Sequence, residues 1–380
     1  MSLTVVPCIN SFKKMKRSLT FINDVSFIKP NQYCSGRDYI SATLSILLLA
    51  LLHAVIVYAV VEMNLDTHKI RIDKYVYQAY LIYSATLVGF LFFYPIFVMV
   101  IVRPRRLVSY VIHGCRWHLF SKERLLFSYP VLAIIPLDKS IYSSFKTEIS
   151  NLNSFWLDAP LYKLDRVIFL GNDPWRTFQQ IIGDPNITCV IDFLYHPIWM
   201  SLVTITILFH ALGRHSLEIR LRFFLSYIIV WAGLGSALAT VLSSAGPCYF
   251  SQVTGQTSPY AELFGYLYSV KADGFALNAV RIQEMLWNGH VNSILEYGGG
   301  ISAMPSIHIA TTALFALSMR NTYPILEKLL YCFTFVIWVG SIHLGWHYAS
   351  DGLVSGLCVI VIWHYSGKLT NKIITKKNMK

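Results

Sequence analysis

The chain has 380 residues, of which 55% are hydrophobic and only 14% are charged. A soluble globular domain carries about 25% charged residues, so this composition excludes the ordinary soluble classes and indicates an integral membrane protein. The formal net charge of +12 could suggest a nucleic-acid partner. Membrane proteins, however, concentrate Lys and Arg in their cytoplasmic loops, and the distribution along this chain favours that explanation, so we expect no nucleic-acid partner.

Eight apolar segments are candidates for membrane-spanning helices. The third is the weakest, because two prolines and the charged pair Asp138 and Lys139 interrupt it. Between the third and fourth segments, residues 146–188 carry apolar positions every three to four residues, which predicts short amphipathic helices on the membrane surface. The predicted spans are residues 40–61, 77–102, 125–145, 191–212, 223–242, 303–319, 329–343 and 352–367. The predicted fold class is therefore all-α: a polytopic membrane bundle of about eight transmembrane helices with short interfacial helices.

Eight spans place both ends of the chain on one side, and the positive charge indicates which side. Of the 32 Lys and Arg residues, 22 fall on the side of the two tails, so the positive-inside rule predicts cytoplasmic tails. We expect no cleavable signal peptide, because residues 1–37 lack the apolar core that such a signal needs. The predicted parts are a cytoplasmic tail (1–39), three transmembrane helices (40–145), an outer-face amphipathic segment (146–190), a core domain (191–367) and a basic cytoplasmic tail (368–380).

The seven cysteines are scattered singly, without a C-x-x-C pair, and predict neither a zinc site nor a disulfide framework. A single bridge between Cys189 and Cys248 remains open, since both would lie near the outer face. His343 and His347 are four residues apart and resemble half of a metal site. No third or fourth ligand follows at suitable spacing, so we expect no metal.

Two histidines and one aspartate form the candidate catalytic group. Asp351 follows His347 by four residues, so its carboxylate can fold back on the imidazole if the backbone turns into a helix there. The ring would then be fixed in one tautomer, with its other nitrogen free to act on a substrate. In the predicted topology His308 reaches the same extracytoplasmic face. An ionisable cluster at a membrane boundary indicates a functional site.

The residues around these histidines carry a family resemblance. AMPSIH (303–308) and GWHYASD (345–351), separated by one helical hairpin, resemble the second and third motifs of the type 2 phosphatidic acid phosphatase (PAP2) superfamily. The Met-Pro-Ser-x-His form is similar to the branch that contains inositol phosphorylceramide synthases and related bacterial membrane proteins. The resemblance covers about residues 240–366, and residues 191–367 are accordingly expected to form a PAP2-like catalytic core.

The resemblance implies a role for each matching residue. His347 corresponds to the nucleophile that forms a phosphohistidine, Asp351 to the carboxylate that orients it, and His308 to the acid that protonates the leaving alcohol. Ser306 lies in the turn before the second-motif histidine, where backbone N–H groups could bind phosphate oxygens. The implied partners are a phosphorylated lipid and a water or alcohol acceptor, with no metal or organic cofactor.

Three cations of typical members are missing. The stretch SSAGPCYF (243–250) has no Lys or Arg where the first motif has them, and Ser341 occupies the place of an Arg in the third motif. Phosphoryl transfer depends on such charges. Arg281 and Lys271 are the candidate phosphate-binding replacements, followed by Arg166 and Arg176.

The favoured function is inositol phosphorylceramide synthase-like phosphotransfer, from a lipid to another lipid or an alcohol. We expect it at the periplasmic or outer face of a bacterial inner membrane. Two alternatives stay open: a transporter or flippase whose outer-face histidines gate protons, and a catalytically degenerate member of the family.

Overall fold

A computed structural model describes five stretches of the chain: residues 34–64, 70–73, 75–213, 215–292 and 298–375. Within these stretches all regular structure is helical, which confirms the predicted fold class. Most of the predicted N-terminal tail and the end of the basic C-terminal tail lie outside the described residues.

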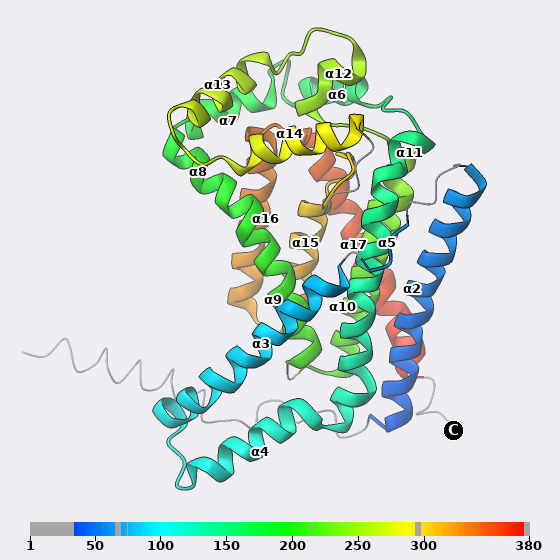
Figure 1. Cartoon of the computed structure of the whole chain (residues 1–380), viewed down its shortest axis with the longest axis vertical. Coiled ribbons are helices and arrows are strands. Elements are labelled where there is room, and N and C mark those ends of the chain that lie inside the picture. The colour runs from blue at the N-terminus through cyan, green and yellow to red at the C-terminus, as the bar shows by residue number, and fades with distance from the viewer. Residues whose placement is uncertain (1–33, 65–69, 74, 214, 293–297, 376–380) are drawn as a thin grey trace, which may run out of the picture.

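Eight helices of the described stretches correspond to the eight predicted spans. Most of them run along the long axis of the molecule, whereas the second crosses it obliquely (Figure 1). The eight helices are α2 (Gly36–Asn64), α3 (Val76–Phe97), α5 (Tyr129–Leu152), α9 (Trp199–Leu212), α10 (Leu217–Ile229), α15 (Ile307–Met319), α16 (Pro324–His343) and α17 (Ala349–Thr375). Four π-helical turns extend or precede them: η1 (Val98–Val102), η2 (Arg124–Ser128), η3 (Leu194–Ile198) and η4 (Val230–Leu238). Helix α2 begins, and α17 ends, at the same end of the bundle.

Seven helical segments in the described part of the chain are long and apolar enough to cross a membrane. The eighth predicted span corresponds to α15, which has only 13 residues and is about 20 Å long at 1.5 Å per residue, against a hydrocarbon core of about 30 Å. All its residues from Ile309 to Met319 are buried, because α10, α16 and α17 surround it. A helix that is apolar all round suits such a position in the core.

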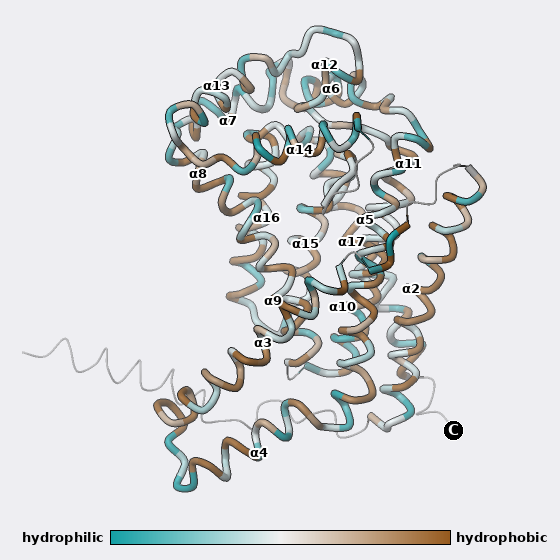
Figure 2. Tube along the Cα trace, viewed as in Figure 1, coloured by the Kyte–Doolittle hydropathy of each residue, from teal (hydrophilic) through white to brown (hydrophobic). Residues whose placement is uncertain are grey.

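The outside of the bundle is apolar, as a lipid environment requires. Helices α2 and α3 are hydrophobic along most of their length (Figure 2), and α3 buries no residue of its own. Side chains such as Leu48 and Val88 are 62% and 67% exposed. These exposed apolar faces, together with the seven candidate spans, identify a multi-pass membrane protein.

Short helices cover the end of the bundle at which α15 begins and α16 ends (Figure 1). Two of them, α6 and α7, fall within the segment predicted to form amphipathic surface helices. Between the second and third predicted spans, helix α4 (Leu107–Phe120) lies at the opposite end. The covering elements are α6 (Asp158–Ile168), α7 (Pro174–Ile182), η5 (Pro247–Tyr249), α12 (Phe250–Thr254), α13 (Ala261–Ala272) and α14 (Asn278–Val291). Helix α8 (Pro185–Phe193) is continuous with η3 and α9, and α11 (Ala239–Val241) is the last turn of the helix that begins with α10. Cys189 and Cys248, in this region, are both free.

Helix α5 continues to Leu152, beyond the predicted end of the third span at residue 145. It does so because Ile141, Phe145 and Ile149 recur every four residues and form one buried cluster with residues of α2. Its Asp138, predicted to weaken the span, is instead buried and accepts a 2.7 Å hydrogen bond from His53 on α2. The added turns include Lys146, the residue predicted to begin the amphipathic surface segment.

Candidate active site

His347 and Asp351 lie at the start of α17. The backbone turns between α16 and α17 at Gly345, whose φ of +71° favours glycine, and a Cβ there would come within 2.5 Å of the Phe264 ring. The Nδ1 of His347 lies 3.2 Å from the Asp351 Oδ2 atom, which also accepts a hydrogen bond from the Tyr348 backbone N–H at 3.1 Å. Asp351 is fully buried. Its contact fixes the Nδ1-protonated tautomer of His347 and leaves Nε2 as the free nitrogen.

His308 occupies the first turn of α15 and is clamped between two aromatic rings. Its ring stacks on Tyr195 with a centroid distance of 4.3 Å and lies 3.9 Å from Trp199. Trp199 is itself held by a 3.0 Å hydrogen bond to the Thr311 hydroxyl, one turn further along α15. The centroids of the His308 and His347 rings are 6.3 Å apart. The structure thus brings together His308, His347 and Asp351, which are up to 43 residues apart in the sequence.

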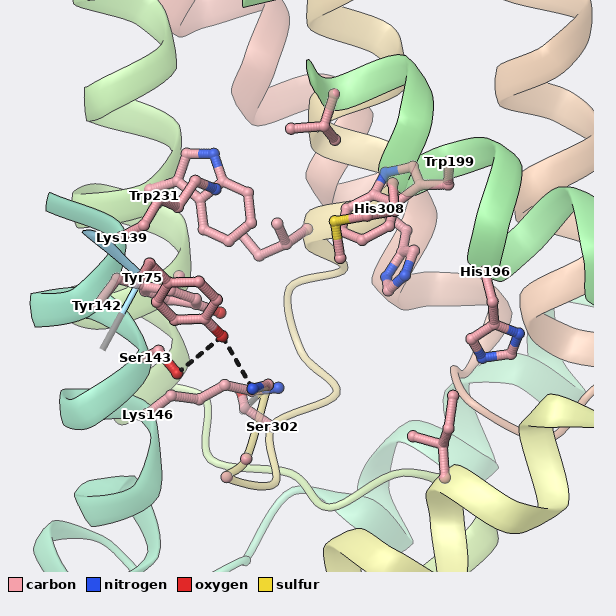
Figure 3. A pocket seen from close by; sticks show the side chains of 18 of the residues that line it. Tyr75, Lys139, Tyr142, Ser143, Lys146, His196, Trp199, Trp231, Ser302 and His308 are labelled. Atoms are coloured by element: carbon pink, nitrogen blue, oxygen red, sulfur yellow. Dashed lines mark hydrogen bonds between the residues drawn. The ribbon is translucent and has the colours of Figure 1, made fainter. Parts of the chain in front are cut away.

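Both histidines open into one cavity of about 650 Å³. Its walls come from α3, α5, α9, η4 and the loop before α15, and most of the lining surface is apolar. Figure 3 shows His308 on one side of this cavity and Lys139, Lys146 and Tyr142 on the other. A cavity of this size suits a lipid-sized or drug-sized ligand.

Two lysines of α5 line the cavity, and neither is among the site residues predicted from the sequence. Lys139 and Lys146 are seven residues apart, two helical turns, and so lie on one face of α5 (Figure 3). The Lys139 ammonium group sits over the Trp231 ring. Their seven-residue spacing within an otherwise apolar segment was the available signal. The predicted boundary at residue 145 hid this signal, because it left Lys139 as an interruption of the third span and assigned Lys146 to the amphipathic surface segment.

The first-motif stretch without a cation is held in place by Asp158 of α6. Its carboxylate accepts hydrogen bonds from the Ser244 hydroxyl and from the backbone N–H groups of Ala245 and Gly246, at 2.8–3.0 Å. It also accepts one from the Tyr348 hydroxyl at 2.9 Å. Burial raises the pKa of Asp158, while these hydrogen bonds act in the opposite direction. A buried carboxylate therefore ties the first-motif stretch to the residue that follows His347.

Asp165, seven residues further along α6, anchors the beginning of α17. It accepts hydrogen bonds from the backbone N–H groups of Ala349 at 2.6 Å and Ser350 at 2.9 Å. These donors have no partner inside the helix. Burial raises the pKa of this carboxyl too, again against its hydrogen bonds. Asp165 thereby positions the helical turn that carries Asp351.

We expect Asp165→Ala to destabilise the protein by about 1–3 kcal/mol, because two buried N–H groups lose their acceptor. Thermal unfolding in detergent, followed by the midpoint temperature, measures this effect. The matched control is Glu262→Ala. Glu262 is an exposed acid whose ion pair with Arg176 is worth at most about 1 kcal/mol. Equal midpoints for the two variants would contradict the anchoring role.

The other predicted site residues take different positions. Ser306 is buried immediately before α15, and its Oγ has no hydrogen-bond partner among the described residues. Lys271 pairs with Glu284 at 3.1 Å, and Arg281 lies 3.4 Å from the Asn278 side chain. Neither of these two cations lines the cavity.

The remaining candidate cations and the third-motif serine do not line the cavity. Arg166 and Arg176 both lie near Asp173 on the surface, outside the cavity lining. Ser341, which occupies the place of a third-motif arginine, is buried. Its backbone carbonyl accepts hydrogen bonds from the N–H groups of Trp346 and His347. These backbone hydrogen bonds shape the turn before His347, but they do not supply the charge of the missing arginine.

Fold and site together define a multi-pass helical membrane protein with a His-His-Asp group at one end of the bundle. The family model of the PAP2 superfamily matches residues 159–366, more than half of the chain, and the chain belongs to this superfamily. Members of this superfamily are typically phosphatases or phosphotransferases. Comparison with curated proteins and with solved structures finds no match. Helices α2 to α5 precede the matched residues, although α3 and α5 contribute to the cavity wall.

Proposed function

We propose that this protein is a lipid phosphotransferase that works through a phosphohistidine intermediate. The observation that carries the proposal is the single cavity that contains both His308 and His347 and is otherwise mostly apolar. A phosphorylated lipid would place its phosphate between the two rings and its chains along the apolar wall.

In the first half-reaction, the Nε2 lone pair of His347 attacks phosphorus. A P–N bond forms and the bond between phosphorus and the leaving oxygen breaks, while His308 donates a proton to that oxygen. Asp351, in contact with Nδ1, stabilises the positive charge that develops on the His347 ring. In the second half-reaction, the acceptor hydroxyl attacks phosphorus, His308 takes up its proton, and the P–N bond breaks.

Lys139 and Lys146 are proposed to supply the charge that the first and third motifs lack. Both line the cavity that His308 and His347 share, and ammonium groups stabilise the developing charge on phosphoryl oxygens. The N-terminus of α15 next to Ser306 would add backbone N–H groups. Lys271 and Arg281 are less favoured for this role, because the cavity lining does not include them.

Transfer to a lipid hydroxyl or another alcohol is favoured over hydrolysis. Apolar residues of α3, α5 and α9, including Ile82, Ile135 and Val203, form much of the wall, and such a wall suits a second apolar substrate better than free water. This agrees with the resemblance to inositol phosphorylceramide synthases. From the positive-inside rule we propose that the site lies at the outer face of the membrane, and that this membrane is a bacterial inner membrane.

The test separates the two chemical steps with substrates of different leaving groups. We expect His308→Ala to slow turnover of a natural phospholipid by about 10²–10⁴-fold, the usual contribution of a general acid. A p-nitrophenyl phosphodiester needs no protonation of its leaving group, so its burst of p-nitrophenol should be nearly unchanged. Mass spectrometry of the products with and without an added alcohol then measures transfer against hydrolysis.

The matched control is His290→Ala, which removes a histidine of the same face that does not line the cavity. Equal losses on both substrates would show that His308 is not the leaving-group acid. A phosphomonoester released by water, with no phosphodiester of the added alcohol at any alcohol concentration, would rule out transfer in favour of hydrolysis.

A further inference from the structure

A second cavity, of about 470 Å³, lies at the opposite end of the bundle from the two histidines. It is formed where α10 begins, α15 ends and α17 ends, and we call it the distal pocket. Arg222, Arg320 and Lys368 line it, with Glu218 as the only carboxylate in its wall. Unlike the cavity that His308 and His347 share, which we call the catalytic cavity, it is lined mainly by polar side chains.

The three cations of the distal pocket outnumber its single lining carboxylate, Glu218. Within the described stretches of the chain, none of them has a carboxylate at ion-pair distance. The pocket therefore concentrates positive charge in a partly enclosed space, which attracts anions.

Arg222 is held in a fixed position. Its Nε donates a 3.0 Å hydrogen bond to the Trp363 carbonyl, and its guanidinium lies 4.0 Å from the centre of the Trp363 ring. The missing side chain of Gly367 makes room for it, since a Cβ there would come 2.8 Å from Arg222 Cζ. The two terminal nitrogens have no hydrogen-bond partner among the described residues. This leaves a preorganised fork that matches two oxygens of a phosphate.

Thr370 provides an independent observation. Its side chain lines the distal pocket and is only 2% exposed, yet its Oγ1 atom has no hydrogen-bond partner in the described part of the chain. A buried hydroxyl without a partner is costly. A ligand oxygen in the pocket would satisfy it.

We propose that the distal pocket binds a phosphate-bearing anion, either the headgroup of an anionic phospholipid or a soluble phosphate compound. Basic pockets between transmembrane helices are suited to such headgroups, and both sources share the chemistry that Arg222, Arg320 and Lys368 recognise. This site is separate from the catalytic cavity and does not depend on the proposed reaction.

The experiment uses the full-length protein in nanodiscs. One arm contains phosphatidylcholine mixed with phosphatidylglycerol, and native mass spectrometry counts the retained phosphatidylglycerol. The other arm contains phosphatidylcholine alone and is titrated with inorganic phosphate. In at least one arm, Arg222→Gln and Lys368→Gln should weaken binding by about tenfold or more, the loss expected for a hydrogen bond to a charged group.

Three further variants make the result specific. Lys328→Gln removes an exposed lysine of α16 that does not line the distal pocket, and it should bind as the parent does. In a Lys146→Gln background, which weakens phosphate binding in the other cavity, Arg222→Gln should still lower binding. Thr370→Val should weaken binding without changing the charge. Thermal unfolding checks that each variant is folded.

If Arg222→Gln and Lys368→Gln weaken binding only in the lipid arm, the ligand is a phospholipid headgroup. If they weaken binding only in the inorganic phosphate arm, the ligand is a soluble phosphate compound. The proposal is overturned if Lys328→Gln weakens binding as much as Arg222→Gln, because the effect would then be diffuse attraction. It is also overturned if folded Arg222→Gln binds both probes like the parent.

Discussion

Replacing His347 with Ala should lower kcat/KM for phosphoryl transfer by about 10³-fold or more, because no other group would form the P–N bond. Two observations support this expectation: His347 lines the cavity, and its Nδ1 lies 3.2 Å from the buried Asp351, which leaves Nε2 without that partner. The decisive measurement is trapping of the phosphoenzyme with a radiolabelled phospholipid. The label should be acid-labile and alkali-stable, as a phosphohistidine is, and absent from His347→Ala.

Asp351→Asn provides a graded comparison for the same experiment. The amide keeps the shape of the side chain but loses the charge that orients and stabilises the His347 ring, so labelling should slow without disappearing. His290→Ala, on the same face, should label normally. Full labelling of His347→Ala would exclude this histidine as the nucleophile and, with it, the mechanism proposed above.

Lys146→Gln should lower kcat by about 10²-fold, the usual loss when one donor to a developing oxyanion is removed. Lys146 and Lys139 are the two lysines among the cavity-lining residues. The first and third motifs of this chain lack the cations that typically bind the phosphoryl oxygens. Lys146→Arg, which keeps the charge, should retain most of the activity. Steady-state kinetics with a short-chain phospholipid, together with inhibition by orthovanadate, measures both the rate and the affinity for a phosphoryl-like anion.

The matched control for Lys146 is Lys163→Gln, which removes an exposed lysine of α6 that does not line the cavity. A role in charge stabilisation predicts a lower kcat and weaker vanadate inhibition only for the Lys146 variant. If Lys146→Gln changes only KM for the lipid, the residue binds substrate in the ground state and another group must stabilise the transition state.

The fold class could be predicted from composition and hydropathy, since the bilayer requires long apolar helices whose signal is local in the chain. Helix ends were less predictable. Helix α5 runs to Leu152 because packing of Ile149 against α2 residues continues it, and α15 is shorter than a span because neighbouring helices bury it.

The cavity and its lysines could not be predicted in the same way. Helices α3 and α5 precede the family-matched residues, and nothing in their local sequence indicates that they border the histidines. The two acids of α6 were likewise missed. Asp158 and Asp165 are seven residues apart on one face, but their acceptor role depends on backbone N–H groups more than 80 residues away.

The sequence by itself determined the membrane class, the order of the helices and the pairing of His347 with Asp351, because hydropathy and an i,i+4 spacing act within a few turns of one chain segment. Only the tertiary structure decided that His308 lies between Tyr195 and Trp199, that Lys139 and Lys146 face the same cavity, and that Arg222 and Lys368 line a second one. The physical reason is that a cavity consists of side chains from several helices, and their relative rotation is set by packing between helices rather than by any one segment.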